Sequence, residues 1–204
     1  MIPFQLVKLH PEVLLAPFNH RKELLSKFRD VLGLLNLDYV SIEIVNPDDV
    51  YMFFSSLSSI NYNVISNHLW PYDGGMSPSF FKAYSSYRWE QTYHVAFSKE
   101  LKRLKQGEFG FSDDLTLVRK VNNFYLLYSF ASKSQSNIGA YGGHHHDELL
   151  KIGDYCYKQI RPIYLQYCDT YIPPHIHCFS PYAPGEPQDI VSTRSHLRLV
   201  VNHI

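Results

Sequence analysis

Two groups of histidines are the candidates for metal chemistry in this sequence. His144–His146 are consecutive, and a second group comprises His175, His177 and Cys178. Imidazole and thiolate ligands suit zinc. However, consecutive side chains rarely converge on one ion, and the sequence has no HExxH motif. We therefore expect residues 144–146 to lie in a solvated loop, and we expect no metal site unless the two groups meet in space.

Nucleophilic catalysis has weaker support. Cys168 or Cys178 beside a histidine could form a dyad, whereas Cys156 falls on the apolar face of a predicted helix, as a buried structural thiol does. There is no GxSxG motif, and the Gly-Gly pairs at 74–75 and 142–143 match neither GxGxxG nor GxxxxGK[ST]. We therefore expect a non-enzymatic protein without a cofactor. A His/Cys-dependent enzyme remains a third alternative.

Ligand binding is indicated by the aromatic segment 62–97. It contains ten Tyr, Trp and Phe residues, with Asp73 among them. A pocket that orients an amide or a lactone needs apolar walls, a few directed donors and an acceptor. The same aromatic residues could equally fill an ordinary core.

Two hairpins and two helices are the clearest elements that could position these groups. Apolar spacing predicts a helix over 20–36 with Asn19 as its N-cap. Strands over 39–45 and 50–54 flank an Asn-Pro-Asp-Asp turn, and the alternation in 39–45 indicates one buried face.

The second hairpin pairs 115–121 with 124–132 around an Asn-Asn turn. Asp113 and Asp114 precede it and indicate turn or cap chemistry. A long helix begins near Asp147, and Pro162 is expected to kink it or to end its regular part.

The remaining segments are less regular. They comprise a helix over 59–69, a loop over 70–75, a helix over 78–87, a strand over 93–97, a basic helix over 99–106 capped by Ser98, and a Pro-rich tail over 169–204 with one late element at 196–201. This order predicts an α/β fold, an α-β-α sandwich of the GAF/PAS-like sort. Its central, mainly antiparallel sheet of about five strands would be flanked by helices, and such folds often hold a ligand between sheet and helices.

Composition narrows the class of protein. Hydrophobic residues make up 45% and charged residues 19% of the 204 residues, which is typical of a globular chain. Lys+Arg and Asp+Glu both number 19, so the basic excess of a nucleic-acid-binding domain is missing. Three cysteines without CxxC spacing, no signal peptide and no long apolar run favour a cytoplasmic protein that does not enter a membrane.

A family resemblance starts at residues 109–117, Phe-Gly-Phe-Ser-Asp-Asp-Leu-Thr-Leu. This run resembles the entry to the central hairpin of LuxR-type autoinducer-binding domains, the sensory halves of bacterial quorum-sensing transcription regulators. The strand 124–132 ends in Ala-Ser, as the family's next strand commonly does. The distances back to Trp89, Asp73 and Tyr62 are also similar. The resemblance covers about residues 18–167.

The resemblance implies ligand-binding roles for Tyr62, Asp73, Trp89 and Ser129, and we add Tyr72 of the aromatic segment to the expected ligand-binding set. Asp73 would accept a hydrogen bond from the ligand's amide N–H. Trp89 would donate its indole N–H to a lactone carbonyl or wall the head group. Tyr62 would contact the amide carbonyl, and Ser129 would offer its hydroxyl.

Two departures from the family pattern bear on the ligand. The family's Asp-Pro step is Asp73-Gly74 here, and Asp114 stands where a glycine normally follows the hairpin motif. Both favour a small amphiphile other than acyl-homoserine lactone itself. Residues 169–204 are too short and too Pro-rich for the family's helix-turn-helix, so we expect no direct contact with nucleic acid.

The sequence therefore predicts a sensory domain over 1–168 followed by a C-terminal arm over 169–204. We expect an orphan or truncated LuxR-type sensor that binds a small amphiphilic signal and acts as a homodimer or through a protein partner. A ligand-free interaction module on the same fold, such as a bacterial effector or a dominant-negative partner of regulators, is the second alternative.

Overall fold

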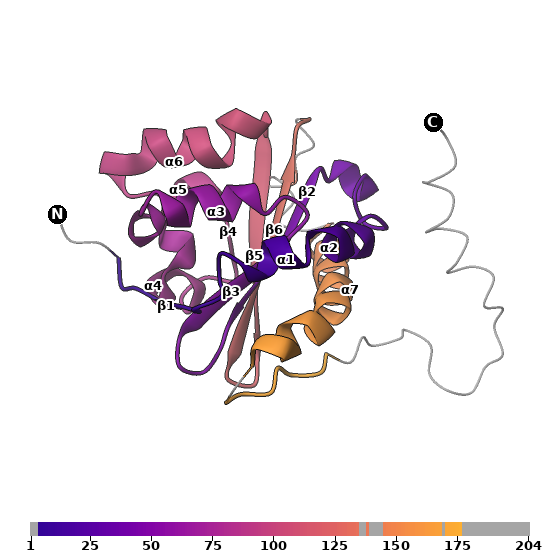
Figure 1. Cartoon of the computed structure of the whole chain (residues 1–204). Coiled ribbons are helices and arrows are strands. Elements are labelled where there is room, and N and C mark those ends of the chain that lie inside the picture. The colour runs from indigo at the N-terminus through magenta and orange to yellow at the C-terminus, as the bar shows by residue number, and fades with distance from the viewer. Residues whose placement is uncertain (1–3, 135–137, 139–144, 169, 177–204) are drawn as a thin grey trace.

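A six-stranded sheet forms the middle of the molecule, with helices on both faces (Figure 1). The computed structural model describes residues 4–134, 138, 145–168 and 170–176. The strand order is β1-β3-β2-β6-β5-β4, and every pairing is antiparallel except that of β1 with β3. The predicted α/β sandwich with a mainly antiparallel sheet is confirmed, with one strand more than expected.

The strands are β1 (Lys8–Leu9), β2 (Tyr39–Val45), β3 (Val50–Ser55), β4 (Ser86–Tyr87), β5 (Asp113–Val121) and β6 (Phe124–Ser132). Both predicted hairpins are confirmed. In the first turn, the Asn46 side-chain oxygen accepts the backbone N–H groups of Asp48 and Val50. In the second turn, Asn122 adopts a φ of 54°, the left-handed conformation that a two-residue hairpin turn needs.

The helices are α1 (Ala16–Asn19), α2 (Arg21–Phe28), α3 (Ser59–Ser66), α4 (Pro78–Phe81), α5 (Trp89–Thr92), α6 (Ser98–Lys105) and α7 (His146–Tyr164). Helices α2 and α7 cover one face of the sheet, and α3 to α6 gather on the other (Figure 1). α7 continues two residues past Pro162 before a 3-10 turn over Leu165–Tyr167.

The predicted helix over 20–36 was wrong in its length and in its cap. α2 ends at Phe28, and Asn19 belongs to α1, so His20 precedes α2 without a side-chain capping bond. Gly33 has a φ of 90° and starts a 3-10 turn that redirects the chain into β2. The apolar spacing continues through this region, but the chain forms turns after Phe28, and the positive φ angles at Gly33, Leu35 and Asn36 keep the helix from resuming.

The predicted helix over 78–87 and strand over 93–97 also differ. α4 stops at Phe81, and Ser86–Tyr87 instead pairs with β5 as strand β4. Val95–Phe97 forms a 3-10 turn in which Val95 is exposed. Both errors arise because short apolar runs do not reveal whether a long-range sheet partner is present.

Both faces of the sheet are buried. All seven residues of β2 are buried, so the prediction of one solvated face was wrong. Val40, Ile42 and Ile44 pack beneath α2 and α7. Glu43 lies under the layer of α3 to α6, and Ser41, two residues before it in β2, shares that face. A polar side chain taken out of water needs compensating hydrogen bonds. The polar middle of this second face therefore defines the candidate site.

None of the helices in the described residues has the length and apolar character required to traverse a lipid bilayer. The predicted tail is described only over 170–176. His144, His177, Cys178 and the expected element at 196–201 lie outside the described residues.

Candidate functional site

A cavity of about 20 Å³, roughly the space for one water molecule, lies between the sheet and the helices α3 to α6. The sheet lines it with Glu43, Thr116 and Ser129, and the helical layer lines it with Asp73 and Lys105. Aromatic walls come from Tyr39, Tyr51, Tyr87 and Trp89. The lining therefore combines charged and hydroxyl groups with aromatic and aliphatic side chains.

Asp73 is the most heavily bonded carboxylate of the cavity. It lies between two 3-10 turns and is only 2% exposed. One of its oxygens is 2.7 Å from the Lys105 ammonium, and the other is 3.0 Å from both the Thr92 hydroxyl and the Gly75 backbone nitrogen. A Cβ at Gly74 would stand 2.7 Å from the Thr92 carbonyl oxygen, so this close approach requires glycine after Asp73.

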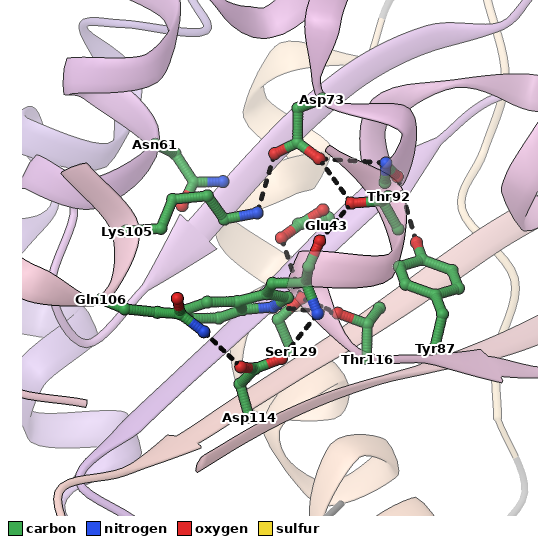
Figure 2. A network of polar contacts seen from close by, with 12 residues as sticks. Glu43, Asn61, Asp73, Tyr87, Thr92, Lys105, Gln106, Asp114, Thr116 and Ser129 are labelled. Carbon is green, nitrogen blue, oxygen red and sulfur yellow. Dashed lines mark hydrogen bonds and ion pairs between the residues drawn. The ribbon is translucent and has the colours of Figure 1, made fainter. Parts of the chain in front are cut away.

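Lys105 turns inward from the last residue of α6, and its ammonium points at Asp73 (Figure 2). Its side chain is 12% exposed. The Lys105 nitrogen stands 4.7 Å from the centre of the Trp89 ring and 5.4 Å from that of Tyr93. The ammonium therefore has one carboxylate and two aromatic faces around it, a combination that favours cations.

A chain of hydrogen bonds crosses the floor of the cavity and ends on Glu43 (Figure 2). The Trp89 indole N–H donates to the Thr116 hydroxyl at 3.2 Å, and the Ser129 hydroxyl donates to Glu43 at 3.1 Å. The Thr116 and Ser129 oxygens are 2.8 Å apart. Because the single Ser129 proton is used on Glu43, Thr116 must donate to Ser129. The bonds therefore run in one direction, and each strengthens the next.

Glu43 is the carboxylate with the most perturbed titration. Burial raises its pKa to about 7 from an ordinary value of 4.5, and nearby Asp73 adds to the rise. Lys105 and the Ser129 hydroxyl act in the opposite direction. The Glu43 side chain therefore exchanges a proton near neutral pH.

Asp113 and Asp114 bind residues at the N-terminal end of α5. One Asp114 oxygen accepts the backbone N–H of Trp89 at 2.6 Å, and the other accepts the Gln106 amide at 2.7 Å. Arg88 forms an ion pair with Asp113. Burial raises the pKa of Asp114 despite these bonds. The acidic pair thus acts as a cap that places Trp89 over the cavity.

A second set of hydrogen bonds orders the tyrosines. The Tyr39 hydroxyl donates to the Asn61 carbonyl oxygen, and the Asn61 amide donates to the Tyr51 hydroxyl, each at 3.0 Å. The Tyr87 hydroxyl donates to the Gly75 carbonyl at 3.0 Å. These bonds hold the aromatic walls in place.

The structure brings three of the five sequence-predicted residues to the cavity: Asp73, Trp89 and Ser129. Tyr62 is 39% exposed and packs edge-on against Phe18, outside the lining. Its neighbour Asn61 lines the cavity instead, because it lies on the inner side of α3. Tyr72 also lies outside the lining, and the centre of its ring is 4.0 Å from the centre of the Phe97 ring.

Sequence reasoning missed Glu43 and Lys105. Glu43 occupies a position that a half-buried strand would expose, and Lys105 belongs to a helix that was predicted only to be basic. The available signal was the polar pair Ser41 and Glu43 in a strand whose ends and neighbours are strongly apolar.

The histidine and cysteine groups form no site within the described part of the chain. No group of three or more His, Cys, Asp or Glu side chains is placed there to hold a metal ion. His145 contacts Glu148 on the first turn of α7. Cys156 is buried in the α7 face of the core, and burial raises the pKa of its thiol. The cavity lining contains no His or Cys among these residues.

No known protein-family model matches the chain, and no curated protein matches it. Two solved structures of SdiA, a LuxR-type quorum-sensing regulator, are similar to it. SdiA in complex with octanoyl-rac-glycerol is 17% identical with a TM-score of 0.48, covering 78% of this chain and 65% of that one. Escherichia coli SdiA in another crystal is 15% identical with a TM-score of 0.48, covering 75% and 71%. This chain therefore spans 65% of the length of the first SdiA chain.

Proposed function

We propose that this protein is a small-molecule-binding sensor domain, similar in role to LuxR-type autoinducer-binding domains, and that it is not an enzyme. The observation that carries the proposal is the convergence of buried polar side chains on one cavity beneath α3 to α6. A purely structural core rarely contains so many polar groups, because each must be desolvated and then satisfied. Buried acceptors and donors beside aromatic walls are what a ligand site uses to orient a small molecule.

The ligand would contact Asp73, Trp89 and Ser129. In the described state these groups are bonded internally, to Lys105, Thr116 and Glu43 respectively. Ligand binding therefore requires exchange of these internal partners and expansion of a cavity of about 20 Å³.

The covering layer is suited to such movement. It consists of α3 to α6, helices of four to eight residues joined by 3-10 turns and by the two-residue strand β4, and short helices derive most of their stability from packing. We propose an amphiphilic signal, with a polar head at Asp73 and an apolar tail between the helical layer and the sheet.

We extend the proposal to the organisation of the chain. Residues 1–168 would form the bacterial, cytoplasmic sensory domain, and 169–204 an arm without DNA-binding function. The signal would pass through a homodimer or a protein partner, because a net charge of zero gives little attraction for a phosphate backbone.

Native mass spectrometry of protein purified from its host tests ligand binding directly. We expect a stoichiometric small molecule that is lost on denaturation. In titrations with that molecule, Asp73→Asn and Trp89→Phe should each weaken binding at least tenfold, about 1.4 kcal/mol, while the fold is retained. Tyr62→Phe is the matched control and should bind normally. Unchanged affinity in both cavity variants would remove these residues from the site.

A second function, a ligand-free interaction module, is favoured by one observation. The cavity is small, and its carboxylates are already bonded within the chain. Under this alternative the protein purified from its host would contain no small molecule and would carry a stoichiometric partner chain. The same mass spectrum distinguishes the two functions.

A further inference from the structure

We propose that the cavity is an ammonium-binding site, that Lys105 occupies it in the ligand-free protein, and that the ligand is a small organic amine that displaces Lys105 from Asp73. This inference rests on the proposed ligand-binding function and adds the chemical class of the ligand.

The environment of the Lys105 ammonium shows how the site would recognise such a group. Its nitrogen is 2.7 Å from an oxygen of Asp73, and the Trp89 and Tyr93 ring centres lie at 4.7 and 5.4 Å. A carboxylate on one side and aromatic faces on the others are the usual surroundings of a bound organic cation. An ammonium group on a free ligand can make the same contacts.

The balance of charge around the cavity also favours a cationic ligand. Glu43, Asp73 and Asp114 are each at most 7% exposed, and Lys105 is the one basic side chain that lines the cavity among the described residues. Lys105 pairs with Asp73, whereas the described contacts of Glu43 include no cation within 4 Å. Buried carboxylates therefore outnumber basic side chains around the cavity, which favours a cation over an anion as the ligand.

Exchange of one ammonium for another avoids a large electrostatic cost. If a neutral ligand removed Lys105, the Asp73 carboxylate would stay buried without its cation, which is strongly unfavourable. An amine replaces the charge directly. Lys105 is the last residue of α6, so its side chain can swing to solvent and keep its charge near the helix C-terminus, where cations are favoured.

The groups facing Glu43 determine how such binding depends on pH. They are Asp73 from the loop after α3, Lys105 from α6, and the tyrosines Tyr39, Tyr51 and Tyr87 from β2, β3 and β4. Burial keeps the pKa of all three hydroxyls above their ordinary value, so the tyrosines stay neutral. Glu43 gains its charge as the pH rises through about 7, and amine binding should strengthen over the same range.

A matched pair of probes tests the inference on the wild-type protein. Hexylamine and 1-hexanol share a chain and differ in the charge of the head. Titrations would follow the Trp89 indole N–H signal in NMR spectra, assigned with Trp89→Phe. We expect hexylamine to bind at least tenfold more tightly than hexanol at pH 8, with a smaller ratio at pH 6.

Lys105→Met provides a second test, because it keeps most of the side-chain length and removes the competing ammonium. We expect it to bind hexylamine at least tenfold more tightly than the wild type. Lys102→Met is the matched control, since Lys102 lies on the same helix, exposed and paired with Glu90. It should leave the affinity unchanged.

The outcomes separate this inference from the proposed function. Equal affinity for hexylamine and hexanol in the wild type would overturn the ammonium site and leave a neutral-ligand sensor in place. Binding of neither probe, together with an empty protein from the host, would overturn both. Tight binding of the amine alone would support both, and the wild-type comparison holds even if Lys105→Met fails to fold.

Discussion

The two faces of the sheet differ in the chemistry of their centres. Ile42 and Glu43 are neighbours in β2 and point to opposite faces. Ile42 lies in a cluster of fully buried apolar side chains beneath α2 and α7, whereas Glu43 joins a polar network beneath α3 to α6. Continuous apolar packing holds one face together, while hydrogen bonds and one ion pair hold the middle of the other. Both faces contribute an apolar core, but only the α3-to-α6 face has a charged, hydrogen-bonded network at its centre.

The α7 face shows how closely an apolar face can pack. A Cβ at Gly153 would stand 2.0 Å from the ring of Tyr128, so glycine is what allows α7 to approach the sheet there. The Tyr128 hydroxyl donates to Asp154, the next residue of α7, which also pairs with Arg119 at 3.2 Å. The Arg119 side chain is 32% exposed, so this network opens to solvent at its edge.

The largest effect in this comparison should come from the α7 face. Ile160→Ala removes a fully buried side chain and leaves a cavity, so we expect a loss of about 2–5 kcal/mol in the free energy of unfolding. Urea denaturation measures this loss. Lys158→Ala on the exposed side of α7 should change the free energy of unfolding by less than about 0.5 kcal/mol. A small effect of Ile160→Ala would contradict the close apolar packing of this face.

Glu43→Gln should change how the stability of the protein depends on pH. The folded pKa of about 7 lies above the ordinary 4.5, so the folded protein retains a proton that the unfolded chain releases, and stability falls as the pH rises through this interval. The Glu43→Gln variant has no ionisable group at this position, so its stability does not fall in this way as the pH rises. One pKa unit corresponds to about 1.4 kcal/mol, so we expect the variant to exceed the wild type by roughly 1–3 kcal/mol at pH 8.

Thermal unfolding at pH 5 and pH 8 measures this difference, and the two proteins should converge at pH 5. Parallel pH profiles would show that Glu43 does not carry the raised pKa.

Thr116→Val should have an intermediate effect. The substitution keeps the shape of the side chain and removes the hydroxyl that links Trp89 to Ser129. Because the buried indole N–H then lacks its acceptor, we expect a loss of about 1–2 kcal/mol in the free energy of unfolding. Urea denaturation and the NMR shift of the indole N–H report it. An unshifted indole signal would show that the bond contributes little in solution.

Tyr62→Ala should have the smallest effect. Its ring is partly exposed and contacts Phe18 edge-on, so we expect a loss of about 0.5 kcal/mol or less and no change in ligand affinity. Denaturation and ligand titration provide the two measurements. Weakened ligand binding would instead show that Tyr62 belongs to the site and that α3 rearranges when the ligand binds.

The elements that were predicted correctly have strong local signals. The alternating β2 and the apolar run of β3 flank a turn of Asn, Pro and Asp, β5 and β6 flank Asn122, and α7 repeats its apolar residues every three or four positions. β1 and β4 are only two residues long and exist because a distant strand pairs with them. No local pattern encodes that pairing.

The candidate site was predictable only in part for the same reason. Asp73, Trp89 and Ser129 carry residue types that resemble a known pattern, and the structure gathers them at one cavity. Glu43 and Lys105 carry types that usually face water. Only the packing of α3 to α6 across the sheet reveals that they are buried, and this packing depends on contacts far apart in the sequence.

The order of the strands has a consequence for how the protein is made. The central pair joins β2 to β6, and the bond between Glu43 and Ser129 spans 86 positions of the chain. During synthesis, β2 and β3 leave the ribosome long before their partner exists, with one edge of β2 unpaired. Sheets with such distant pairings fold slowly. That edge of β2 therefore lacks its partner until residue 132 has emerged, and the site can assemble only then.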